Sequence, residues 1–174
     1  GFILAIIYSL PPFKLCYRGL GEFTVGLVFG PLVLNGMYVV MAGQFELLPV
    51  LVSIPVGLLI ANVLWINQFP DYEADARANK RNWVVRLGKQ KSVKVYAIIF
   101  ALTYIFIGII ALYANNPIWL IGLLSVPLAV KAVKNCKQNF NNIPELLKSN
   151  QTTVQIYMLN GILLAIAAII NGRF

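Results

Sequence analysis

The sequence predicts an all-α membrane protein, a multi-spanning bundle of transmembrane helices. Of its 174 residues, 59% are hydrophobic and only 11% are charged, and the mean hydropathy is +0.77. A soluble domain has about 25% charged residues and about 45–50% apolar ones. The apolar residues also fall into several long runs, most of them close to the ~20 residues that an α-helix needs to cross a bilayer.

The residue counts also exclude several kinds of chemistry. The chain contains no His, which excludes acid–base catalysis by imidazole and metal sites that need His. Cys16 and Cys136 lie far apart and form no CxxC pattern, so neither a disulfide framework nor a thiolate metal site is indicated. The same composition argues against a disordered, collagenous or coiled-coil chain.

The first apolar run, residues 2–8, is too short to cross a bilayer and lacks the basic start of a signal peptide. We therefore expect it to be the tail of another helix, and the chain to be the C-terminal part of a longer protein. Residues 1–174 show no internal repeat and no linker, which predicts a single membrane domain. The five full spans are expected at residues 23–42, 47–66, 93–113, 118–133 and 154–170.

Each of these spans has its own justification. The runs 23–42 and 47–66 are free of charge, and 93–113 carries only Lys94, close enough to its start for the ammonium to reach the interface. The run 118–133 is shorter and contains Pro127, which membrane helices tolerate because neighbouring helices satisfy the freed carbonyls. The run 154–170 follows a polar entry at residues 152–153.

The basic residues give the chain an orientation. If the spans alternate in direction, loops 9–22, 67–92 and 134–153 share one side. All Lys and Arg residues except Arg173 lie in these loops or at the adjoining span ends, while residues 43–46 and 114–117 contain none. The positive-inside rule places the three long loops in the cytoplasm. The net charge of +8 is thereby explained without a nucleic-acid partner, and the same face suits a phosphate-bearing ligand.

Half of the six acidic residues lie together, just after the second full span. The spacing N-x3-D-x3-D places Asn67, Asp71 and Asp75 on one face if the segment is a continuous helix, although Pro70 is expected to kink it. Like charges one helical turn apart repel, and carboxylates at a helix C-terminus oppose the helix dipole. A positive group should therefore compensate them.

Two compensating groups are compatible with the sequence. One is a set of local ion pairs with Arg77, Lys80 and Arg81 in a solvated loop. The other is Mg²⁺, a hard cation that binds one or two carboxylates together with substrate phosphates. In that case the metal ligands would be Asn67, Asp71 and Asp75, with the two aspartates as catalytic residues. The rest of the phosphate group would then bind to Lys80, Arg81 and Arg86.

The first long loop offers a second set of candidates. Its sequence, YSLPPFKLCYRGLGE, contains Lys14, Tyr17 and Arg18 between a Pro-Pro pair and two glycines. These residues would be topology anchors and an interfacial aromatic in an ordinary juxtamembrane loop. In the functional alternative the loop covers a cytoplasmic cavity, where Arg18 or Lys14 binds an anionic group and Tyr17 contacts an aromatic substrate.

These two loops resemble a known family. YRGLGE before one span, followed by NQFPDYEADARANKRNWVVRLG after the next, is similar to the UbiA superfamily of intramembrane prenyltransferases. Within it the loops most resemble the dihydroxynaphthoate polyprenyltransferases of the menaquinone pathway. The resemblance covers essentially the whole chain, as the C-terminal portion of the family's nine-helix fold. The chain departs from the family pattern at Asn79, where many relatives have Gly, and at Asn82, where they often have Thr.

The resemblance implies Mg²⁺-dependent transfer of a polyprenyl group from its diphosphate to an aromatic acceptor. It also implies a plasma-membrane protein of a prokaryote with cytoplasmic active-site loops. Asn67, Asp71 and Asp75 match the second of the family's two aspartate-rich motifs; the first is absent from this chain, so we expect the 174 residues alone to be inactive. Other acceptors (hydroxybenzoate, chlorophyllide or a glycerol phosphate) stay open, as do a non-catalytic membrane scaffold and a transporter segment.

Overall fold

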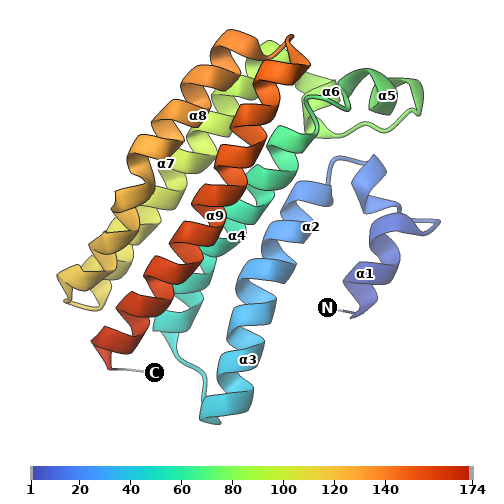
Figure 1. Cartoon of the computed structure of the whole chain (residues 1–174). Helices are drawn as coiled ribbons and strands as arrows, with labels where there is room; N and C mark the ends of the chain where they lie inside the picture. The colour runs from blue at the N-terminus through green and yellow to red at the C-terminus, as the bar shows by residue number, and fades with distance from the viewer. Residues whose placement is uncertain (1, 173–174) are drawn as a thin grey trace.

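The computed structural model describes residues 2–172, and every regular element in that range is a helix (Figure 1). Five helical segments are long and apolar enough to cross a membrane, so the fold class is confirmed. The first consists of α2 (Gly21–Leu27), the π-helical η2 (Val28–Leu32) and α3 (Val33–Ala42). The others are α4 (Leu47–Asn67), α7 (Lys89–Tyr113), η3 (Pro117–Ser125) with α8 (Val126–Asn139), and α9 (Ile143–Asn171).

The third predicted loop, residues 134–153, is wrong in extent. Helix α8 continues to Asn139 and α9 already begins at Ile143, so the polar residues expected to precede the last span lie inside it. The Asn142 side chain accepts a hydrogen bond from the Glu145 N–H (3.5 Å), Pro144 occupies the first turn, and Glu145 follows there. These are standard signals of a helix start. Helix α7 likewise starts at Lys89, four residues earlier than predicted.

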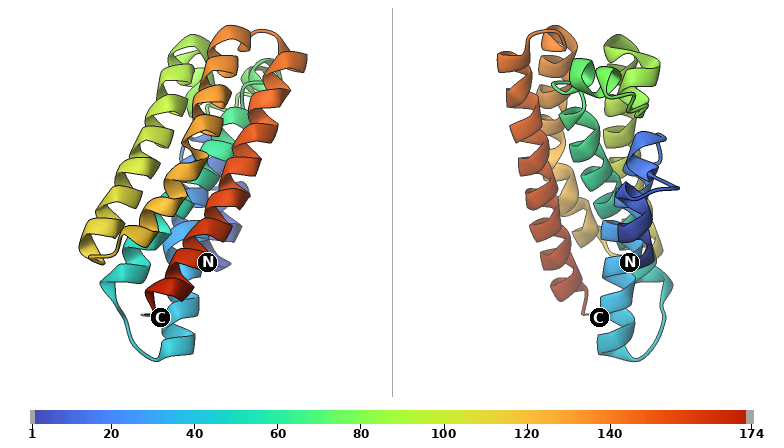
Figure 2. Two further views of the ribbon diagram at one scale, coloured as in Figure 1. Left: turned by 60° about the vertical axis from the view of Figure 1, so that its left-hand side comes forward. Right: turned by 90° about the vertical axis from the view of Figure 1, so that its right-hand side faces the viewer.

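Helix α4 is the centre of the bundle. It packs against α7 and α9 on one side and against α2 and η2 on another, as the two views of Figure 2 also show. The Trp65 indole N–H donates to the Ser92 carbonyl of α7 (3.1 Å), and Ile66 and Phe69 are fully buried in the cluster around Tyr96. The charged loops that precede α2 and follow α4 are thus supported by well-packed helices.

Three glycines allow α4 and the α2–η2 segment to approach closely. A Cβ added at Gly30 would lie 2.6 Å from the Ser53 carbonyl oxygen and 2.7 Å from the Gly57 Cα. One added at Gly57 would lie 2.5 Å from the Gly26 carbonyl oxygen. Gly26 and Gly30 form the G-x3-G spacing that lets membrane helices pack backbone against backbone. The position of the first loop relative to the second depends on this crossing.

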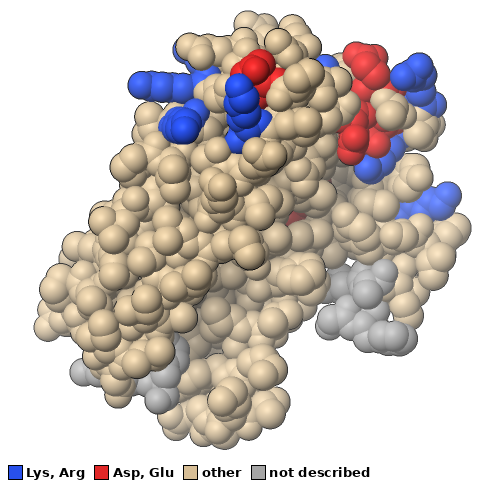
Figure 3. All heavy atoms as spheres, viewed as in Figure 1, with Lys and Arg blue, Asp and Glu red and all other residues tan. Residues whose placement is uncertain are grey.

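The remaining elements are short and carry the charged loops. They are α1 (Phe2–Ser9), η1 (Leu15–Tyr17), α5 (Tyr72–Arg77) and α6 (Trp83–Leu87). In Figure 1, α5 and α6 lie at the upper end of the bundle, directly above the loop between α1 and α2. Among the described residues, Lys and Arg side chains gather at the same end, and the lower half of this face shows none of them (Figure 3). The five long apolar helices support an integral membrane protein, and its polar loops lie at one end of the bundle.

Candidate active site

The two loops singled out in the sequence are joined by hydrogen bonds. The Arg81 N–H donates to the Tyr17 carbonyl (2.9 Å). The Arg86 guanidinium bridges both loops, because its Nε donates to the Arg81 carbonyl and its Nη2 to the Arg18 carbonyl, each at 2.8 Å. Residues 14–22 and 71–88 therefore form one polar assembly, which we call the loop pair.

Gly19 is required where the loop pair closes. Its φ is +78°, in the left-handed region, and an added Cβ would lie 3.2 Å from the Arg81 carbonyl and 3.5 Å from the Arg86 guanidinium. Both the backbone conformation and the close approach favour glycine over any other residue. The neighbour that Gly19 approaches is the second loop.

Asp75 is already paired within its own loop. Its carboxylate accepts hydrogen bonds from Lys80 Nζ (3.1 Å) and from Asn82 Nδ2 (2.7 Å), and the residue is buried. The Asn82 side chain also caps α6 by accepting from the Val85 N–H at 2.9 Å. Of the two alternatives drawn from the sequence, local pairing thus describes Asp75 in this structure.

Asp71 and Asn67 differ from Asp75. The continuous helix considered for the three residues is wrong: α4 ends at Asn67, a turn covers the Pro70 region, and Asp71 is the residue before α5. Asp71 and Asn67 are both exposed. Within residues 2–172 the Asp71 carboxylate makes no ion pair and no hydrogen bond, while Asn67 Oδ1 accepts from Asn150 Nδ2 of α9 at 2.8 Å.

The predicted phosphate-binding side chains are engaged to different degrees. Arg86 is committed to backbone carbonyls and stacks on Trp83, 5.6 Å from the ring centroid. Lys80 is paired with Asp75, and Arg18 donates to the Pro12 carbonyl at 2.9 Å. Among the described residues the Arg81 guanidinium has no hydrogen-bond or ion-pair partner. Lys14 lies over the Tyr17 ring at 5.6 Å, so these two side chains of the first loop lie together.

The structure adds a buried carboxylate, that of Glu22 in the first turn of α2. Glu22 Oε1 accepts from Gln68 Nε2 at 2.8 Å and from the Trp83 N–H at 3.5 Å, and Glu22 is 7% exposed. These two hydrogen bonds form a further link between α2 and the second loop. A signal was present, because acidic residues are common in the first turn of a helix, but its partner Gln68 has no sequence signature.

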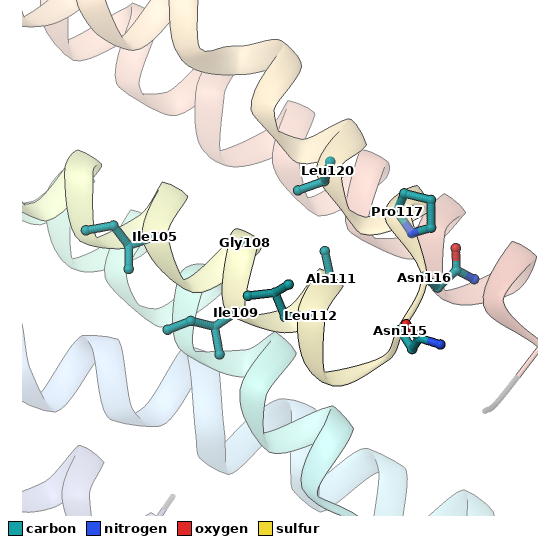
Figure 4. Close-up of a pocket in the computed structure, with 9 residues that line it drawn as sticks. All are labelled: Ile105, Gly108, Ile109, Ala111, Leu112, Asn115, Asn116, Pro117 and Leu120. Carbon is teal, nitrogen blue, oxygen red and sulfur yellow. The ribbon is translucent and has the colours of Figure 1, made fainter.

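Beside Glu22 an apolar groove of about 360 Å³ runs between α2 and α4. Its walls include Trp65, which is two residues from Asn67 and so about 200° away around α4. The groove and Asn67 thus lie on opposite faces of that helix. A second groove, of about 580 Å³, lies at the far end of the bundle between α7 and η3 (Figure 4). It is lined mainly by Ile105, Ile109, Leu112, Pro117 and Leu120, and lies on neither charged loop.

The donor set around Asp71 suits Mg²⁺ in one specific way. Within residues 2–172 no three side chains among His, Cys, Asp and Glu are close enough to form a complete metal cage. Mg²⁺ is usually held by one or two carboxylates and completed by water and substrate phosphates. The exposed, unpaired carboxylate of Asp71 fits that mode, and Asp75 would serve as a second carboxylate ligand if Lys80 moved away from it.

Fold and loops together define the class: an integral membrane protein with a polar, anion-suited site at one end of a helical bundle. Comparison with known sequences identifies the family within this class, because the model of the UbiA prenyltransferase family matches residues 1–142. The chain belongs to this family. No solved structure matches it.

Three relatives show the range of the similarity. The chain is 30% identical to UbiA prenyltransferase domain-containing protein 1 of Dictyostelium discoideum over 79% of this chain and 42% of the relative. It is 26% identical to 1,4-dihydroxy-2-naphthoate octaprenyltransferase of Bacillus subtilis over 98% and 55%. It is 29% identical to 2-carboxy-1,4-naphthoquinone phytyltransferase of a Synechocystis species over 93% and 53%. The chain therefore spans about half the length of these relatives.

Proposed function

We propose that the full-length protein transfers a polyprenyl group from a polyprenyl diphosphate to an aromatic acceptor in a Mg²⁺-dependent reaction, with dihydroxynaphthoate as the acceptor. The observation that carries this proposal is the exposed, unpaired carboxylate of Asp71 in the loop pair, in the same loop as the unpartnered cation of Arg81. Family membership supports the reaction class, and two relatives with naphthoate and naphthoquinone names support the acceptor.

The reaction must break an allylic C–O bond while negative charge builds on the leaving diphosphate. Mg²⁺ bound by Asp71 and Asp75 would neutralise part of that charge. Arg81 lies in the same loop with its guanidinium free to add charge-assisted hydrogen bonds to phosphate oxygens. Lys80 becomes available for the same purpose if Asp75 turns to the metal. Arg86 keeps the two loops together, so its contribution is to hold these groups in place.

The first loop is assigned to the acceptor. Tyr17 is 40% exposed and its ring is flanked by the Lys14 ammonium, so it offers an aromatic face and a cation to an anionic aromatic ring. Arg18 is held by the Pro12 carbonyl through one nitrogen and keeps further donors. We place this polar end on the cytoplasmic side of the membrane, following the distribution of Lys and Arg, and the prokaryotic plasma membrane follows only from the family resemblance.

The test uses the full-length protein in lipid nanodiscs with one polyprenyl diphosphate. Dihydroxynaphthoate, hydroxybenzoate, chlorophyllide and glycerol phosphate are offered in separate reactions, each with Mg²⁺ and with EDTA. We expect a prenylated product from dihydroxynaphthoate with Mg²⁺ and none with EDTA. Transfer to another acceptor alone would replace the naphthoate assignment. No transfer to any acceptor, or equal transfer in EDTA, would contradict the proposal.

A further inference from the structure

A buried amide of α9 is turned toward the polar end of α4. Asn150 is 9% exposed, and its Nδ2 donates to the Ile66 carbonyl (3.4 Å) and to Asn67 Oδ1 (2.8 Å). A backbone carbonyl can only accept a hydrogen bond, so the contact with Ile66 identifies the Asn150 atom on this side as the nitrogen. The Asn67 atom that meets it is therefore the amide oxygen.

The orientation of Asn67 follows from this contact. Its oxygen is turned toward α9, which leaves its NH₂ group, with two donors, without a partner among residues 2–172 at an exposed position. Such a group matches the oxygens of a phosphate, which are acceptors only. An amide that served a metal would present its oxygen instead, because the nitrogen has no lone pair to offer.

The other end of Asn150 indicates why an amide is present there. Its Oδ1 is buried and has no hydrogen-bond partner among residues 2–172. A buried acceptor without a partner destabilises the fold, and an apolar side chain of similar size would avoid that cost. The functional end of Asn150 is therefore its nitrogen, and the described atoms that this nitrogen contacts are the Ile66 carbonyl and Asn67.

We propose that Asn150 is a positioning residue that fixes the Asn67 amide with its N–H donors facing the diphosphate of the substrate. This inference rests on the proposed function, and it assigns Asn67 to the phosphate oxygens in place of the metal. Asn150 itself does not contact the substrate in this account. It acts from α9 through a single hydrogen bond to the last residue of α4.

The first test measures binding rather than turnover. Inorganic pyrophosphate is titrated into the full-length protein in nanodiscs with Mg²⁺ by calorimetry. Asn150→Ala removes the hydrogen bond that orients Asn67, together with the one to the Ile66 carbonyl, and we expect about 3- to 10-fold weaker pyrophosphate binding. In the transfer assay the KM for the prenyl diphosphate should rise by a similar factor, with kcat changed less than twofold. Unchanged pyrophosphate affinity would overturn the inference.

The matched control lies on the same helix. Asn160→Ala also removes a buried amide, which donates to Ser125 Oγ at 2.6 Å, but it lies almost three turns away from Asn150. We expect this variant to lower thermal stability and to leave pyrophosphate affinity unchanged. An equal loss of affinity in both variants would show a general packing effect and would overturn the positioning role.

A comparison at Asn67 itself separates the two chemical roles. Asn67→Asp keeps oxygens for Asn150 and for a metal but removes both donors, whereas Asn67→Ala removes everything. If Asn67 donates to phosphate, Asn67→Asp binds pyrophosphate no better than Asn67→Ala; if it ligates the metal, Asn67→Asp binds better, which overturns the inference. Asp71→Asn distinguishes the underlying proposal: wild-type pyrophosphate binding in that variant contradicts the Mg²⁺ site itself.

Discussion

At the scale of single residues, the charged side chains of the loop pair divide into two groups. Arg86, Lys80 and Arg18 donate to carbonyls or to Asp75, whereas the Asp71 carboxylate and the Arg81 guanidinium have no partner among the described residues. The sequence identified all five as candidates, but it could not separate the groups. Which donors are used depends on backbone carbonyls brought together by folding, and carbonyls are the same at every position.

Substitution of Arg86 tests its bridging role. A lysine ammonium is a point charge without the planar fork that lets guanidinium reach two carbonyls at once. We expect Arg86→Lys to speed amide hydrogen exchange of the Arg81 N–H about 10-fold, measured by mass spectrometry on the reconstituted protein. Arg77→Lys is the control, because Arg77 Nε donates only to the Glu73 carbonyl of its own helix (3.2 Å). Identical exchange in the Arg86 variant and the wild type would exclude the bridge.

Two departures from the family pattern receive a physical explanation at this scale. Asn79 has φ +53°, a left-handed conformation that Asn tolerates better than most residues other than Gly. Asn82 caps α6 through its oxygen, a role in which Thr also serves, and uses its nitrogen to hold Asp75. The sequence showed both differences. Only the structure shows the backbone angle of Asn79 and the hydrogen bond from Asn82 to Asp75.

At the scale of helices, hydropathy located every span, and the errors lie at their ends. The lysines at 134, 137 and 148 lie outside the apolar runs, which predicts a loop there, yet they lie on helices that project beyond the apolar stretch. Hydropathy indicates where the part of a helix inside the bilayer core ends, whereas capping residues indicate where the helix itself ends. The Asn-Ile-Pro-Glu start of α9 carried the second kind of signal.

The glycine crossing between η2 and α4 gives a prediction at this scale. An added methyl at Gly30 would lie within 3 Å of the Gly57 backbone, so the helices must separate. We expect Gly30→Ala to lower the free energy of unfolding by about 1–3 kcal/mol, as overpacked cores do. At Gly36, in the same span, nothing lies within 4 Å of an added Cβ. Gly36→Ala should be neutral or slightly stabilising. Thermal melts in detergent compare the two, and equal midpoints would contradict the close packing.

At the scale of the whole molecule, one end of the bundle carries most of the charge and the proposed site. The Lys and Arg residues that orient the chain in the membrane also surround the acidic segment, so the topology and the proposed site are consequences of one distribution of charge. The sequence predicted this arrangement because charge and hydropathy need no knowledge of contacts. The Asn150–Asn67 contact joins residues 83 positions apart and could be found only in the fold.

The most direct test of the account is the Mg²⁺ dependence of prenyl transfer in the full-length Asp71→Asn variant. Its matched control is Glu73→Gln, which neutralises another exposed acid two residues away. We predict that Asp71→Asn folds normally and loses at least 100-fold in activity at saturating Mg²⁺, a loss of about 2.7 kcal/mol of transition-state stabilisation, while Glu73→Gln stays within a few-fold of wild type. Full activity of Asp71→Asn with an unchanged Mg²⁺ requirement would contradict the assignment of the site.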